Sequence, residues 1–159
     1  MKFISQDGQA FEITEYALKH CTKLSKTNSE IFNLTSTNSN ILRKVVQYCE
    51  MHQGNDFIPE IKKPLKSNNM FEIVNFIDAQ YITNLEFEEI FQIIQVAQIL
   101  GINTLIDLSC AYISTKIRGK SSEQIKSLFS SNKIKTDEEF QKQRDNENLA
   151  KRQLIQTSD

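Results

Sequence analysis

The first third of the chain alternates short apolar runs with turn residues. Phe3–Ser5 and Ala10–Ile13 flank the sequence Gln6-Asp7-Gly8-Gln9. Asp-Gly between two apolar runs is a strong β-hairpin signal, because glycine adopts a positive φ without strain. Glu30–Leu34 is a third apolar run of strand length. The pattern predicts three short strands, and between the second and third a helix that begins at Thr14 or Glu15 and contains Ala17, Leu18, Cys21 and Leu24.

The middle of the chain is helical in pattern, with one interruption. Asn38 or Ser39 is a suitable N-cap for a helix whose apolar stripe comprises Ile41, Leu42, Val45, Val46 and Cys49. Residues 53–69 hold both prolines and three lysines, which predicts an exposed loop. Helical periodicity resumes at Phe71 and is expected to end at Gly101. A further helix is then expected from Asn103 or Thr104 to about Arg118.

Two capping boxes predict two C-terminal helices. The first, Ser121-x-x-Gln124, precedes Ile125, Leu128 and Phe129, and the second, Thr136-x-x-Glu139, precedes Phe140 and an increasingly charged stretch.

Three predicted strands near the start of the chain and predicted helices along the rest of it make the fold class α+β. We divide the chain into a mixed domain at 1–118 with an exposed loop at 53–69, a helical extension at 119–150 and a frayed tail at 151–159.

The segment 103–118 carries two apolar stripes where a surface helix needs one. Leu105, Leu108 and Tyr112 form one stripe, and the other consists of Ile106, Cys110, Ile113 and Ile117. Both stripes could close a single core. Alternatively, one packs inward and the other receives a partner, as exposed apolar patches commonly do. The pattern does not decide which stripe faces inward.

Composition narrows the class of protein. The chain has 159 residues and a formal net charge of -1, which argues against broad nucleic-acid binding. Its three scattered cysteines indicate a reduced, intracellular protein rather than a disulfide framework. With neither a signal-peptide pattern nor a long apolar run, we expect a cytoplasmic or nuclear protein that does not bind membranes.

Catalytic and metal-binding motifs are weak. Cys49 and His52 form one loose pair, whereas a structural zinc site needs four convergent ligands. Gly119-Lys120-Ser121 resembles the end of a P-loop but lacks the earlier glycine. A thiol–histidine site built from distant residues stays open on sequence grounds. We expect no enzyme activity, metal, cofactor or small-molecule substrate.

Two charged clusters have simple explanations. Asp137-Glu138-Glu139 lies in the first turn of a predicted helix, where acidic residues complement the helix dipole. Lys62, Lys63 and Lys66 form a small basic patch in the predicted loop. This patch is either simply solvated or contacts an anion or partner.

Several segments, in order along residues 3–150, resemble the Skp1 family of adaptors in cullin-RING (SCF) ubiquitin ligases. Ser5–Ile13 is similar to the family's SSDG-x-x-FEV, and Asn38–Cys49 to its NAAILKKVIQWC. Leu100–Cys110 is similar to LDIKGLLDVTC, and Ile117–Ser121 to IKGKT. Thr136–Glu139, followed by Arg144, is similar to the TEEEE start of the final helix.

The resemblance implies a BTB/POZ domain followed by two C-terminal helices, and a non-catalytic adaptor. It implies that the BTB part binds a cullin and that the last helices bind an F-box protein. The expected F-box contacts are Leu105, Leu108, Tyr112, Ile125, Leu128, Phe129, Phe140, Arg144 and Leu149. The expected cullin contacts are Gln98 and Ile99, where the family has Asn-Tyr.

The departures from the family pattern leave alternatives open. The usual acidic loop is mildly basic here, and Leu149 stands where the family has a tryptophan. The chain could therefore be a structural subunit of a large assembly, bound to one F-box-like partner without a cullin. An elongin C-like adaptor is a third alternative, which the C-terminal extension disfavours.

Overall fold

The computed structural model describes residues 1–52, 58–131, 142, 144–146, 148–149 and 152. These residues fall into two compact units, Met1–Lys120 and Ser121–Asp159, which we describe separately.

The first unit contains a small mixed sheet. Its strands are β1 (Lys2–Ser5), β2 (Ala10–Glu12) and β3 (Ile31–Leu34), in the order β2-β1-β3. β1 and β2 form the predicted antiparallel hairpin, with Phe3 opposite Phe11, and β1 pairs with β3 in parallel. Gly8 in the turn has a φ of 78°, so the glycine of the Asp-Gly signal adopts the left-handed conformation that the hairpin needs. The three predicted strands are confirmed.

Two helices flank β3 in sequence. α1 (Glu15–Leu18) is much shorter than the predicted helix, which was wrong to include Cys21 and Leu24. These two side chains are still buried, but they lie in the turns that follow α1. α2 (Ser39–Met51) begins as predicted, because the Asn38 side chain accepts a hydrogen bond of 3.0 Å from the Ile41 N–H.

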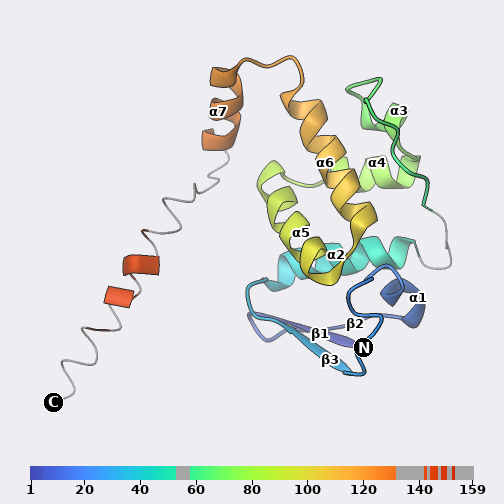
Figure 1. Ribbon diagram of the computed structural model, residues 1–159, viewed down its shortest axis with the longest axis vertical. Helices are drawn as coiled ribbons and strands as arrows, with labels where there is room; N and C mark the ends of the chain where they lie inside the picture. Colours follow the sequence, from blue (N-terminus) through green and yellow to red (C-terminus); the bar gives the residue numbers. More distant parts are fainter. Residues whose placement is uncertain (53–57, 132–141, 143, 147, 150–151, 153–159) are drawn as a thin grey trace. The chain divides into compact units, whose positions relative to one another are not determined.

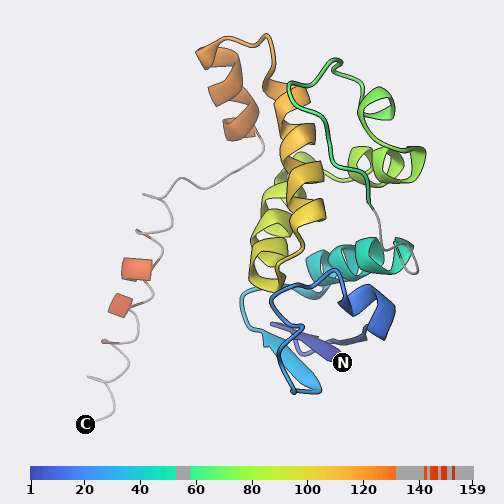
Figure 2. The same cartoon turned by 45° about the vertical axis from the view of Figure 1, so that its right-hand side comes forward.

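The described part of the first unit contains four further helices: α3 (Met70–Ile73), α4 (Phe76–Thr83), α5 (Phe87–Leu100) and α6 (Asn103–Ile117). α2 lies between the sheet and the α5–α6 pair, and α4 packs beside α6 (Figures 1 and 2). Gly101 ends α5 with a φ of 77°, as predicted. The position is closed to larger residues, because a Cβ there would lie 2.9 Å from the Lys23 backbone nitrogen.

The connection between α2 and α3 confirms the predicted loop over 58–69, and residues 53–57 lie outside the described part of the chain. This loop is less exposed than its composition predicts. Ile61 and Leu65 are half-buried against the core, whereas the lysines between and after them point to solvent.

The second unit contains α7 (Ser122–Ser131). The predicted capping box is confirmed: the Gln124 side chain accepts from the Ser121 N–H at 3.0 Å, and the Ser121 hydroxyl accepts from the Gln124 N–H at 3.3 Å. The second predicted box, at Thr136, lies outside the described residues, as does Phe140.

Candidate partner-binding surfaces

The inner side of α6 is one of the two predicted stripes. Leu105, Leu108 and Tyr112 are 0, 2 and 7% exposed and belong to the core of the first unit. α6 packs against α5 and α4, so this stripe fills the space between helices. The expectation that these three side chains meet an F-box is therefore corrected: in the folded unit they are not accessible to a partner.

The outer side of α6 carries the second stripe. Ile106, Ile113 and Ile117 are half-buried, and Cys110 between them is exposed. Their spacing of three and four residues places them along one line of the helix. Ile106 and Ile113 rest against the core with part of each side chain in solvent. α6 therefore keeps an apolar line at the surface of the first unit.

α7 also has an apolar side. Ile125, Leu128 and Phe129 are half-buried, and the residues between and beside them are exposed. The spacing of three and four residues aligns these three side chains on one face. The three side chains that the sequence analysis expects to contact an F-box therefore form one partly exposed apolar face of α7.

The remaining expected F-box contacts lie further along the second unit. Arg144 and Leu149 are helical and exposed, with Leu149 at 56%. A leucine this exposed has apolar area left for a partner to cover, though less than the tryptophan that the resemblance leads one to expect.

The expected cullin contacts lie at the end of α5. Gln98 and Ile99 are both exposed, with Ile99 at 41%. The Lys23 Nζ donates to the Gln98 carbonyl at 2.7 Å, and the Thr22 hydroxyl donates to the Gly101 carbonyl at 2.7 Å. These bonds tie the helix end to the segment after α1, so the two side chains are presented from a fixed backbone.

A third apolar patch was missed in the sequence. Phe71 on α3 and Phe76 on α4 are 47 and 67% exposed, and their ring centroids lie 5.6 Å apart. Ile77 beside them is 55% exposed. The signal was present: α4 is short, and its apolar residues occupy more of its circumference than one buried stripe requires.

The residues weighed for chemistry have structural partners. His52 is buried, and its Nε2 lies 2.7 Å from the Asp78 Oδ1, while the Asn75 amide donates to the Asp78 Oδ2 at 2.7 Å. A hydrogen bond with Cys21, together with burial, raises the pKa of the Cys49 thiol. A raised pKa keeps Cys49 protonated, which is the opposite of an activated nucleophile. These groups join α2 to its neighbours.

The described residues also bear on metal binding and on membrane spans. No group of three or more His, Cys, Asp and Glu side chains is placed to hold a metal ion there. Among the same residues, no helix combines the length and the apolar character needed to cross a bilayer.

Comparison with known proteins shows which family this chain belongs to. Residues 1–54 match the model for the Skp1 family tetramerisation domain, and residues 103–149 match that for the Skp1 family dimerisation domain. The S-phase kinase-associated protein 1 homolog of Tetrahymena thermophila is 33% identical over 135 residues, covering 81% of this chain and 80% of that protein. The chain belongs to the Skp1 family.

Other relatives carry descriptive names. The E3 ubiquitin ligase complex SCF subunit sconC of Arthroderma benhamiae is 30% identical over 121 residues, or 76% of this chain and 73% of that protein. The suppressor of kinetochore protein 1 of Schizosaccharomyces pombe is 27% identical over 155 residues, or 92% of this chain and 95% of that protein. Members of the Skp1 family are non-catalytic subunits of SCF ligases, and the α+β fold with its POZ domain is the one this family has.

Proposed function

We propose that this Skp1-family chain is an adaptor that bridges an F-box substrate receptor to a cullin in an SCF ubiquitin ligase. The observation that carries the proposal is the outer stripe of α6, an apolar line that the first unit leaves at its surface. Relatives named as SCF subunits support the same role. In this role the chain performs no chemistry and works in the cytoplasm or nucleus.

The F-box side of the proposal assigns contacts to both units. On α6 the contacts are Ile106, Ile113 and Ile117, in place of the buried stripe. On α7 and beyond they are Ile125, Leu128, Phe129, Arg144 and Leu149, with Phe140 added from the sequence. Burying partly exposed Ile, Leu and Phe side chains releases about 25 cal/mol per Å² of apolar area, so a line of them supplies the driving force for a stable complex.

The F-box test compares two matched substitutions. Ile113→Asp places a charge on the outer stripe of α6, and Ile77→Asp places the same charge on α4, where Ile77 is 55% exposed. Each His-tagged variant is co-expressed with an F-box protein from the same organism and analysed by size-exclusion chromatography. We expect Ile113→Asp to lose the complex, because a buried unpaired charge costs several kcal/mol, while Ile77→Asp retains it.

A thermal melt of each variant accompanies this test, so that loss of binding is not confused with loss of folding. If a folded Ile113→Asp variant still binds the F-box protein as tightly as the unmodified chain, the outer stripe of α6 is not the contact. A gain in affinity for Leu149→Trp would support the second-unit contacts, since tryptophan buries more area at interfaces.

The cullin side of the proposal assigns contacts to Gln98 and Ile99. The double variant Gln98→Asn with Ile99→Tyr installs the pair that the resemblance leads one to expect at this position. We expect tighter binding of a purified cullin N-terminal domain to the variant, measured by biolayer interferometry, and weaker binding to Ile99→Asp. If neither change alters cullin binding, the end of α5 does not contact the cullin.

A second candidate function is a structural subunit bound to one F-box-like partner. It is favoured by the departures at Gln98 and Ile99 and by the name of the Schizosaccharomyces pombe relative, which refers to the kinetochore. Purification of the chain in one large assembly without a cullin would favour this alternative. Tight binding of the cullin N-terminal domain would exclude it.

A further inference from the structure

The loop between α2 and α3 concentrates positive charge in a chain whose formal net charge is -1. We call residues 58–69 the basic strap. It contains Lys62, Lys63 and Lys66, all exposed, and a single acidic residue, Glu60. Arg118, at the end of α6, adds a fourth cation beside it.

The basic strap is held against α6 rather than left free. The Arg118 Nη1 donates to the Leu65 carbonyl at 2.7 Å, and the Lys63 Nζ lies 3.7 Å from the Asp107 Oδ1. Ile61 and Leu65 are half-buried against the core. An ordered backbone lowers the entropy cost of binding, so the cations are already arranged for a ligand.

Two hollows lie along the strap. One, of about 690 Å³, is lined by residues 60–66 and Arg118. The other, of about 480 Å³, is lined by residues 63–65 and, from α6, by Cys110, Ala111, Ser114 and Arg118. Lys63 and Arg118 line both hollows, and Pro64 and Leu65 give both an apolar wall. The two hollows share four lining residues. The surface they form carries four cations and, beside them, two carboxylates: Glu60, and Asp107, which pairs with Lys63.

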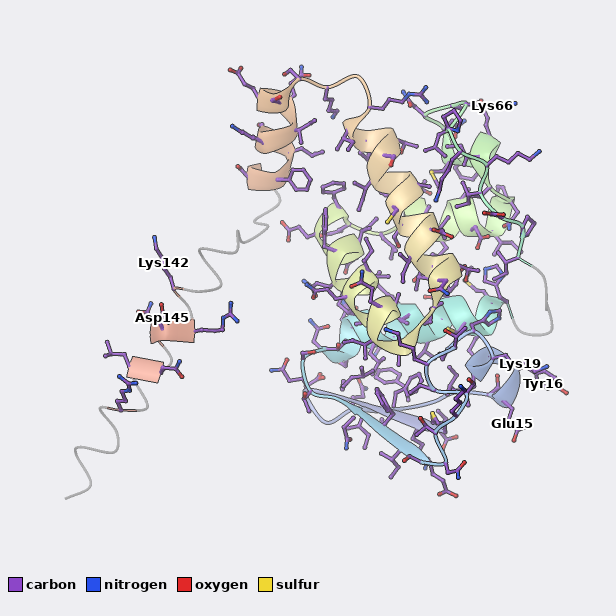
Figure 3. All side chains as sticks on the ribbon, viewed as in Figure 1. Glu15, Tyr16, Lys19, Lys66, Lys142 and Asp145 are labelled. Carbon is purple, nitrogen blue, oxygen red and sulfur yellow. The ribbon has the colours of Figure 1, made fainter. Side chains whose placement is uncertain are left out.

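Lys62 and Lys66 carry charge that the described part of the first unit does not neutralise. Over 1–52 and 58–120, no carboxylate forms an ion pair with either side chain. Lys66 extends from the end of the strap beside α3 (Figure 3). Exposed cations on an ordered backbone attract an acidic ligand and fix its register.

We propose that the basic strap is a docking site for an acidic segment of a partner protein, a short extended run rich in Asp and Glu. One feature favours a peptide over nucleic acid. The Pro64 and Leu65 walls offer an apolar surface to a peptide side chain between its carboxylates.

This site adjoins the outer stripe of α6, because Cys110 belongs to that stripe and also lines one hollow. It lies outside both matched family segments, 1–54 and 103–149, except for the α6 residues that face it. Ser114 on α6 and Arg118 just after it line the hollows, whereas Ile106, Ile113 and Ile117 line neither of them. Cys110 lies at the border between the two surfaces.

The test measures binding of a fluorescein-labelled acidic hexapeptide with one apolar residue, Glu-Asp-Leu-Glu-Asp-Glu, to the full chain by fluorescence anisotropy. The strap variant is Lys62→Glu with Lys66→Glu. The control is Lys19→Glu with Lys26→Glu, which makes the same change in net charge at exposed positions. Lys19 lies at the end of the first unit opposite Lys66 (Figure 3).

We expect the strap variant to bind the peptide at least about tenfold more weakly than the unmodified chain, and the control within about twofold. Affinity falls as NaCl is raised from roughly 50 to 300 mM, because salt screens exposed charges. Any of three results would overturn the proposal. The first is an equal loss of peptide affinity in both variants, and the second is no peptide binding by the unmodified chain. The third is binding of single-stranded DNA or anionic vesicles as tight as that of the peptide.

The same variants separate this proposal from the adaptor role. The strap variant should still form a complex with an F-box protein, because none of the proposed F-box contacts is changed. Loss of F-box binding in the strap variant would overturn the separation of the two surfaces.

Discussion

The division of α6 into an inner and an outer side can be tested by stability. Leu105 is fully buried, and Leu105→Ala removes three carbon atoms from the core. At about 0.8 kcal/mol per buried methylene, the lost transfer free energy is about 2.4 kcal/mol. The cavity that remains adds to this, giving a fall in the free energy of unfolding of about 3 to 4 kcal/mol. For a domain of this size the melting temperature should fall by roughly 10 °C.

The matched control is Ile113→Ala, on the outer side of the same helix. Because Ile113 is only partly buried, its truncation should cost about 1 kcal/mol. Both variants are measured by urea titration with far-UV circular dichroism, which suits a helical chain that has no tryptophan. If Leu105→Ala costs no more than Ile113→Ala, the assignment of the inner side is refuted. Leu105→Asp should prevent folding, so it would not serve as a test of partner binding.

Two further predictions concern the Asp7 carboxylate and the glycine that ends α5. Hydrogen bonds from Ser39 and then Ser5 lower the pKa of Asp7 to about 2, so its ionised form stabilises the fold above about pH 4 and this contribution is lost as the pH falls toward 2. Between these values the melting temperature of Asp7→Asn should fall less than that of the unmodified chain, and parallel melting curves would contradict this. Gly101→Ala should lower the free energy of unfolding by more than about 1 kcal/mol, because a Cβ there meets the Lys23 backbone. Gly119→Ala, with a similar φ of 75° but open space around it, should cost less, and equal costs in urea titrations would refute the steric argument.

Local signals in the sequence were sufficient for most of the first unit. The Asp7-Gly8 turn, the Asn38 cap and the Gly101 stop each involve residues close together in sequence, and each lies where the pattern predicted. The prediction of a helix containing Cys21 and Leu24 was wrong, because the positions of these residues depend on tertiary packing rather than on a local signal. Those side chains are buried by tertiary packing, and a buried position in a turn can imitate helical spacing.

The candidate site was harder to predict, because its decisive property is tertiary. Two apolar stripes on one helix are equivalent in sequence, and only the positions of α4 and α5 determine that Leu105, Leu108 and Tyr112 face inward. The contact between Arg118 and Leu65 joins residues 53 positions apart, so no local pattern could reveal that the basic strap is held against α6.

The most direct test of the adaptor role is to purify the tagged chain from its own cells and identify every protein that accompanies it. The adaptor account predicts a cullin together with several different F-box proteins. It also predicts that the F-box proteins are lost when the Ile113→Asp variant is purified in the same way. A single stoichiometric partner within one large assembly, and no cullin, would contradict the ligase role and leave the structural-subunit alternative.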